Sequence, residues 1–245
     1  MHVLITRPEP DAAELRAQLE ELGHEVTVEP LLRIERSPIT ATALDGITAV
    51  IVTSRNGLRA LAESAAFEGA RELPIIAVGS GTAQLAREFG CAHVIEGPGT
   101  ARDLVPLIVE TSSSLPGPLA HVRGEDAAFD LHGALKAHGI KVREVIAYRA
   151  IPASGLEPRT VALLGGGAID AVILMSPRTG AIFARLTTVG GLREAAGKLV
   201  FLCLSPAVAA AVEPLGPGRV EVSESPNSAA MLATVTRVAT LWSGV

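Results

Sequence analysis

The chain contains the stretch Ala49-Val50-Ile51-Val52-Thr53-Ser54, which recurs 122 positions later as Ala171-Val172-Ile173-Leu174-Met175-Ser176. Each copy is a short uninterrupted apolar run that ends at a hydroxyl residue. Such a run predicts a strand covered on both faces, as in a parallel sheet flanked by helices. The sequence therefore indicates an α/β protein built from two copies of one unit.

The repeat extends along most of the chain. An offset of 125 aligns Ser80 with Ser205, and an offset of 128 aligns 96–101 with 224–229. An offset of 116 aligns Arg7, Leu15, Leu19, Gly23, Val26 and Arg33 with Arg123, Leu131, Leu135, Gly139, Val142 and Arg149. The slow drift of the offset is typical of loop insertions. Two copies predict two similar lobes with a cleft between them, and clefts between domains commonly bind ligands.

Composition narrows the class of protein. The 245 residues carry a net charge of −5, which offers no electrostatic footprint for nucleic acid. No apolar run of about 18 residues is present, so we expect no membrane span. The N-terminal 1–6 reads as a first strand and not as a signal peptide. Cys91 and Cys203 form no C-x-x-C or metal-binding spacing, which favours a reduced, cytoplasmic, metal-free protein.

Short apolar runs alternate with amphipathic stretches, as in parallel α/β sheets. The clearest helix is expected at 11–22, with Gly23 and, in the second copy, Gly139 ending the equivalent helices. Strands are expected at 2–6, 25–34, 48–53, 74–79, 92–96, 119–123, 141–150, 170–175, 199–204 and 219–223.

Two extended segments are unusually long. Residues 25–36 and 141–152 each read as about twelve extended residues, or about 40 Å, twice a typical strand. We expect both to form a two-stranded interdomain ladder. The connectivity would then be crossed, with 1–34 plus 154–245 in one lobe and 38–148 in the other. Two lobes in simple series remain an alternative, although that arrangement leaves the long segments unexplained.

Hydroxyl residues and arginines follow the expected strands. In open parallel sheets ligands bind beyond the carboxyl ends of the strands, where a Ser or Thr can cap the next helix and leave N–H groups for an anion. The turns are Thr6-Arg7-Pro8, 53–57 with Ser54 and Arg55, 79–82 with Ser80 and Thr82, Arg123-Gly124, 176–180 with Ser176 and Arg178, and Ser205-Pro206. They predict a rim for a ligand with several carboxylates or phosphates.

Catalytic machinery is sparse. Neither a nucleophile elbow nor a phosphate-binding loop is present, and Gly79-Ser80-Gly81 lacks the third glycine of a dinucleotide motif. No histidine is expected to be catalytic, and His121 falls inside a strand. Tyr148, the only tyrosine, lies on the second long segment, where it either packs or contacts a ligand. An enzyme of this kind would act on an intrinsically reactive substrate by controlling its geometry.

The chain resembles the uroporphyrinogen-III synthase family over nearly its whole length. The resemblance rests on the order and spacing of short motifs: Thr6-Arg7-Pro8, Thr53-Ser54-Arg55-Asn56-Gly57, Ala77-Val78-Gly79-Ser80-Gly81-Thr82-Ala83, Ile146-Ala147-Tyr148-Arg149 and Ser176-Pro177-Arg178-Thr179. It implies two flavodoxin-like parallel-sheet domains joined by a β-ladder with crossed connectivity.

The resemblance also implies the reaction. The substrate is hydroxymethylbilane, a linear tetrapyrrole with eight carboxylates, which is closed with inversion of ring D and loss of water to uroporphyrinogen III, without cofactor or metal. Without the enzyme, the bilane closes to the type I isomer. Tyr148 matches the tyrosine that assists departure of the hydroxyl, and Thr82 a threonine of the binding cleft. Acetate and propionate chains would be held by Ser54, Ser80, Ser176 and Ser205 with neighbouring backbone N–H groups, and Arg7, Arg123 and Arg178 would add charge.

Other function classes remain open at the level of the residues. A non-enzymatic bilobal binding protein for a small polyanion could use the same turns, although the tyrosine would then be unneeded. A regulatory domain of heme-pathway control would call for a basic DNA-binding segment, and none is present. We expect a monomer.

Overall fold

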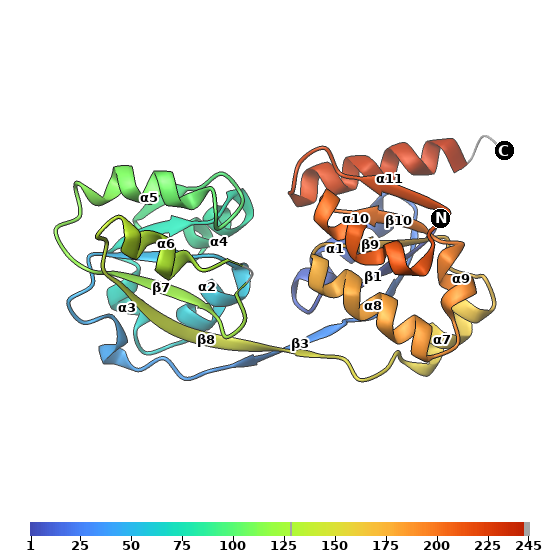
Figure 1. The fold of residues 1–245 in the computed structure, drawn as a ribbon, viewed down its shortest axis with the longest axis horizontal. Helices are drawn as coiled ribbons and strands as arrows, with labels where there is room; N and C mark the ends of the chain where they lie inside the picture. The colour runs from blue at the N-terminus through green and yellow to red at the C-terminus, as the bar shows by residue number, and fades with distance from the viewer. Residues whose placement is uncertain (128, 243–245) are drawn as a thin grey trace. The chain divides into compact units, whose positions relative to one another are not determined.

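A computed structural model describes residues 1–127 and 129–242, and these divide into two compact units (Figure 1). One unit combines Met1–Arg33 with the chain from Ile151 onward, and the other is Ile34–Ala150. Each unit holds a sheet of mainly parallel strands with helices on both faces, which confirms the expected α/β class.

The first unit holds a five-stranded sheet in the order β11-β10-β9-β1-β2, and each neighbouring pair is parallel. Its strands are β1 (His2–Ile5), β2 (Glu25–Val28), β9 (Ala171–Leu174), β10 (Val200–Cys203) and β11 (Arg219–Val222). Its helices are α1 (Asp11–Glu21), α7 (Pro158–Gly165), α8 (Pro177–Val189), α9 (Arg193–Gly197), α10 (Pro206–Val212), the 3₁₀ turn η2 (Glu213–Leu215) and α11 (Ser228–Trp242). Leucines of α1 and apolar side chains of α11 cover one face of the sheet, and α7 to α10 cover the other.

The second unit holds a six-stranded sheet in the order β3-β8-β7-β4-β5-β6. Its strands are β3 (Leu32–Arg36), β4 (Ala49–Val52), β5 (Pro74–Ala77), β6 (His93–Glu96), β7 (Leu119–Gly124) and β8 (Val142–Pro152). Its helices are the 3₁₀ turn η1 (Ala41–Leu44), α2 (Arg55–Ala62), α3 (Phe67–Ala70), α4 (Ser80–Glu88), α5 (Leu104–Ser112) and α6 (Leu131–Ala137). Side chains of α2 and α4 pack on one face, and side chains of α5 and α6 pack on the other.

The segment 25–36 is not the single long strand expected from the sequence. It forms β2 in the five-stranded sheet and then β3 beside β8 in the six-stranded sheet. Pro30 lies between them and has no N–H to donate to a ladder. Leu31 next to it is fully buried in the core of the first unit. The second long segment is one strand, β8, and the boundaries between the two units fall inside β3 and β8.

Strand register reproduces the internal repeat. Ala49 of β4 pairs with Leu119 of β7, and Ala171 of β9 pairs with Val3 of β1. The two pairs are related by the offsets of 122 and 116 found in the sequence. The β4–β7 junction of the second unit is therefore the counterpart of the β9–β1 junction of the first.

The third offset needs correction. Val50 pairs with Ile75 in one sheet, and its counterpart Val172 pairs with Phe201 in the other, so the offset at this strand is 126 and not 125. As a result, Gly79 and not Ser80 is the counterpart of Ser205. Gly79 and Ser205 are indeed the residues that immediately precede helices α4 and α10.

The predicted helix ends are confirmed. α1 buries Leu15 and Leu19 and is followed by Gly23, which adopts a left-handed φ of 80°. Gly139 ends α6 in the same way with a φ of 75°. Both positions use the freedom of glycine at a positive φ.

Candidate functional site

The strand order of the second unit reverses between β4 and β7, because β5 and β6 lie on one side of β4, and β7 and β8 lie on its other side. The helix that follows β4 is α2, and it packs on the same face as α4. Helices α5 and α6, which precede and follow β7 in the sequence, pack on the opposite face. A crevice opens outside the carboxyl ends of the strands at such a junction, and ligands of open α/β sheets bind there. The junction brings the ends of β4, at Thr53 and Ser54, beside the end of β7 at Arg123 and Gly124.

Ser54 and Tyr148 meet at this edge. The Ser54 Oγ lies 3.0 Å from the Tyr148 phenol oxygen. The same Oγ accepts the N–H of Gly57 at 2.9 Å and thereby caps α2, as the sequence predicted. A serine hydroxyl has one proton and two lone pairs, so Ser54 can accept from Gly57 and still donate to Tyr148.

Gly124 makes room for the tyrosine ring. Tyr148 of β8 lies opposite Gly124 of β7, after a register shift that skips one residue of β8. A Cβ at Gly124 would lie 2.8 Å from the Tyr148 Cζ and 3.0 Å from its hydroxyl oxygen. The ring therefore rests directly on the β7 backbone, and only glycine leaves that space.

His121 is a residue of this edge that sequence reasoning did not select. It lies on β7, is only 3% exposed, and its Nε2 lies 2.9 Å from the Thr53 Oγ1 across the junction. Burial, together with a smaller contribution from the charge of Arg123, lowers the pKa of His121 from 6.5 to about 4, so the imidazole is neutral at neutral pH. Its Nδ1 is buried without a hydrogen-bond partner among the described residues. The internal repeat marks His121 as unusual, because the offset of 116 aligns it with the apolar Ile5 of the first unit.

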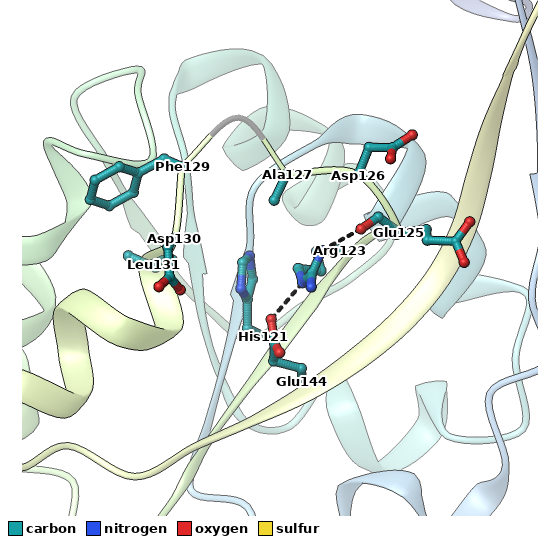
Figure 2. A pocket seen from close by; sticks show the side chains of 9 residues that line it. All are labelled: His121, Arg123, Glu125, Asp126, Ala127, Phe129, Asp130, Leu131 and Glu144. Carbon is teal, nitrogen blue, oxygen red and sulfur yellow. Dashed lines mark hydrogen bonds and ion pairs between the residues drawn. The ribbon is translucent and has the colours of Figure 1, made fainter.

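A pocket of about 340 Å³ lies beside His121 (Figure 2). Figure 2 shows the imidazole ring standing between Arg123 and the start of α6 at Asp130 and Leu131. The other lining residues are Glu125, Asp126, Ala127, Phe129 and Glu144. The wall combines one guanidinium with four carboxylates, so it is a poorer place for an anion than the helix starts nearby.

Arg123 is engaged within the fold. Its Nε donates to Glu144 at 2.6 Å, and its Nη1 donates to the carbonyls of Gly124 at 2.8 Å and Glu125 at 2.7 Å. These bonds hold the β7–α6 loop against β8. The side chain expected to pair with a ligand thus also organises the edge on which Tyr148 rests.

The other predicted residues of the second unit lie at the starts of α2 and α4. Arg55 is the first residue of α2. Ser80 is the first helical residue of α4, and it is exposed; the expectation that it caps the helix is wrong because Gly79 occupies the capping position. Thr82 lies in the first turn of α4 and is 5% exposed.

In the first unit the predicted residues occupy the equivalent edge. Arg7 forms an ion pair with the buried Asp11 of α1 at 2.8 Å. Ser176 caps α8 by accepting the N–H of Thr179 at 3.1 Å, and its Oγ also lies 3.0 Å from the Thr179 hydroxyl. Arg178 follows within the first turn of α8.

Ser205 precedes α10, but its side chain makes no capping bond, so the expected cap is absent there. Pro206, the first residue of α10, offers no N–H to an anion. The Thr6 hydroxyl, expected to cap a helix, instead donates to the Ile173 carbonyl at 2.9 Å and ties β1 to β9.

The structure thus gathers Ser54, Arg55, Ser80, Thr82, Arg123 and Tyr148 in the second unit, and Arg7, Ser176, Arg178 and Ser205 in the first. Within residues 1–127 and 129–242, no group of three or more His, Cys, Asp or Glu side chains could hold a metal ion. No helix in that part of the chain is long and apolar enough to cross a bilayer.

Comparisons with known proteins point to one family. A sequence profile of the family described as uroporphyrinogen-III synthase HemD matches residues 13–233. No curated protein matches the chain significantly.

Two solved structures share the fold. A mutant uroporphyrinogen III synthase from the extremely thermophilic bacterium Thermus thermophilus is 22% identical, with 98% of this chain and 99% of that chain covered and a TM-score of 0.59. The uroporphyrinogen-III synthetase of Helicobacter pylori is 14% identical, with 97% and 99% covered and a TM-score of 0.64.

Proposed function

The chain belongs to the uroporphyrinogen-III synthase family, and on this premise we propose that the Ser54–Tyr148 pair is its catalytic centre. The protein is a lyase of tetrapyrrole biosynthesis that closes hydroxymethylbilane with inversion of ring D and loss of water. The observation that carries the proposal is the 3.0 Å contact between the only tyrosine of the chain and the serine that caps α2.

Tyr148 is placed to act as a general acid. Loss of the terminal hydroxyl as water requires a proton, and the phenol O–H of Tyr148 supplies it in this proposal. As the proton leaves, the Ser54 hydroxyl donates a hydrogen bond to the phenolate oxygen and still accepts the N–H of Gly57, and the phenolate takes back the proton that ring closure releases. The departure leaves a pyrrole-stabilised cation, and the fold of the bound chain then decides which carbon closes the ring.

Substrate carboxylates are assigned to the starts of the capped helices. α2 of the second unit and α8 of the first are each capped by a serine side chain, Ser54 and Ser176. The remaining N–H groups of their first turns can donate to acetate or propionate. Arg55 and Arg178 add positive charge in these first turns, and Arg7, Arg123, Ser80, Thr82 and Ser205 stay within the proposed binding set.

The proposal also covers the oligomeric state, the localisation and the domain bounds of the protein. We infer a monomer in the cytoplasm that binds no nucleic acid, which agrees with the net charge of −5. The domains are the lobe 1–34 plus 154–245 and the lobe 38–148, connected by the segments 25–36 and 141–152. Light scattering of the purified protein tests the monomer.

A coupled assay tests the function. Hydroxymethylbilane is generated in place, the purified protein is added, and the oxidised porphyrins are separated by isomer. We expect mostly type III from the wild-type chain. Type I at the rate of the enzyme-free control, from folded protein, would refute the synthase and leave a polyanion-binding protein.

The Tyr148→Phe variant tests the catalytic assignment. It keeps the ring on Gly124 but removes the proton donor, so we expect kcat to fall about 100-fold or more with little change in KM. Circular dichroism should show an unchanged fold. Unaltered turnover in this variant would remove Tyr148 from the mechanism while leaving the family membership in place.

A further inference from the structure

The two units differ at one pair of positions on the same junction. In the second unit, His121 of β7 bonds Thr53 at the end of β4. In the first unit the offsets of 116 and 122 place Ile5 and Met175 at these positions, and both side chains belong to one apolar cluster. An apolar pair therefore suffices to build this junction.

Retaining the histidine carries a cost for the fold. Its ring is 3% exposed, and the unpartnered Nδ1 has lost its hydration without a bond from the described residues in return. The fully buried Ile5 occupies the equivalent place without a polar group. The second unit thus keeps a costly polar pair where its own repeat shows that none is needed for packing.

The polar pair occurs in the unit that carries the tyrosine. Thr53 directly precedes Ser54, whose hydroxyl meets Tyr148. In the first unit, the offset of 116 places Leu32 at the position of Tyr148, and no phenol is available. There Ser176, the counterpart of Ser54, has the Thr179 hydroxyl as its side-chain neighbour. The second unit therefore has a histidine, a threonine and a tyrosine at the three positions where the first unit has only apolar residues.

We propose that His121 is a positioning residue for the cyclisation, acting through Thr53 to hold the β4–α2 turn so that Ser54 meets Tyr148. The 2.9 Å bond joins the ends of β4 and β7 on the face opposite Tyr148 and limits rotation of the turn. This inference rests on the proposed catalytic role of Tyr148. His121 itself touches no reacting atom in it.

The test replaces the polar pair of the second unit with apolar residues. His121→Ile introduces the residue of the repeat, Thr53→Val removes the hydroxyl at nearly constant volume, and a double variant combines them. We expect each single variant to lower kcat about tenfold, the effect of about 1.4 kcal/mol, with KM changed less than about twofold. The double variant should be no worse than either single variant, because both remove the same bond.

A second readout separates positioning from stability. Tyr148 is the only tyrosine, so the tyrosine doublet of the Raman spectrum reports the hydrogen bonding of that phenol alone. Ser54→Ala gives the reference spectrum for the lost contact, and His121→Ile should shift the doublet toward it. His121→Gln, whose amide can reach Thr53, should restore the wild-type doublet and most of kcat.

Leu119→Val is the matched control, because Leu119 lies on the same strand and in the buried cluster of the α5–α6 face. It should lower stability by about 1 kcal/mol and leave both kcat and the doublet unchanged.

An unchanged kcat or doublet in His121→Ile would overturn the positioning role, and so would an equal loss of kcat in Leu119→Val. These results are distinct from a failure of the catalytic assignment. Only unaltered turnover of Tyr148→Phe overturns that assignment, and it would take the positioning role with it.

Discussion

Acid should destabilise this protein through one buried histidine. Burial lowers the pKa of His121 from 6.5 to about 4 in the folded chain, whereas the unfolded chain keeps the ordinary value near 6.5. Below that value the unfolded chain takes up a proton that the folded chain does not bind. The free energy of unfolding therefore has its full value above about pH 6.5 and falls as the pH approaches 4. At about 1.4 kcal/mol per pKa unit, the loss between pH 7 and pH 4 is about 3 kcal/mol.

The His121→Ile variant removes this one group. Urea unfolding, followed by circular dichroism at pH 7, 5.5 and 4, gives the free energy of unfolding of variant and wild type at each pH. All other titrating groups are shared, so they largely cancel in the difference. We expect the difference to move in favour of the variant by about 3 kcal/mol from pH 7 to pH 4.

The exposed His138 supplies a control through His138→Gln, which should follow the wild-type profile. A difference between His121→Ile and wild type that stays constant with pH would refute the reasoning. It would mean that His121 is solvated, or already protonated, in the folded chain.

Three further outcomes follow from local geometry. Gly124→Ala places a Cβ 2.8 Å from the Tyr148 ring, so the ring must shift. We expect kcat to fall at least about tenfold and the free energy of unfolding in urea to fall by about 1–3 kcal/mol. Wild-type kinetics in this variant would show that the ring position is unimportant. Asp130 caps α6 by accepting the N–H of Gly133 at 2.8 Å, so Asp130→Ala should cost about 1 kcal/mol in urea unfolding, while Asp130→Asn should cost much less. Burial raises the pKa of the Cys203 thiol to about 12 and also raises that of Cys91, so neither should react with a thiol reagent at pH 8 until denaturant is added. Rapid labelling of the native protein would contradict this.

Much of the fold could be predicted from local patterns. The runs at β4 and β9 are uniformly apolar because both sheet faces are covered, and each is fully buried as such a run requires. Ser54 and Ser176 cap helices as expected, because a cap depends only on residues three positions apart.

The sequence-based predictions are wrong where contacts with other strands determine the local structure. The segment 25–36 is extended on both sides of Pro30, but hydrogen bonds to two different sheets divide it into β2 and β3. Ser80 resembled a cap in sequence, yet strand register moves the equivalent position to Gly79. Neither outcome depends on residues close in sequence alone.

The sequence by itself determined the repeated α/β architecture, because burial on both faces and helix termination are encoded in short runs of residues. The tertiary structure alone decided which polar groups meet. Ser54 and Tyr148 are 94 positions apart, and Thr53 and His121 are 68 apart. These pairs form because parallel strands distant in sequence align their carboxyl ends in one register, and that register is set by packing of the whole sheet.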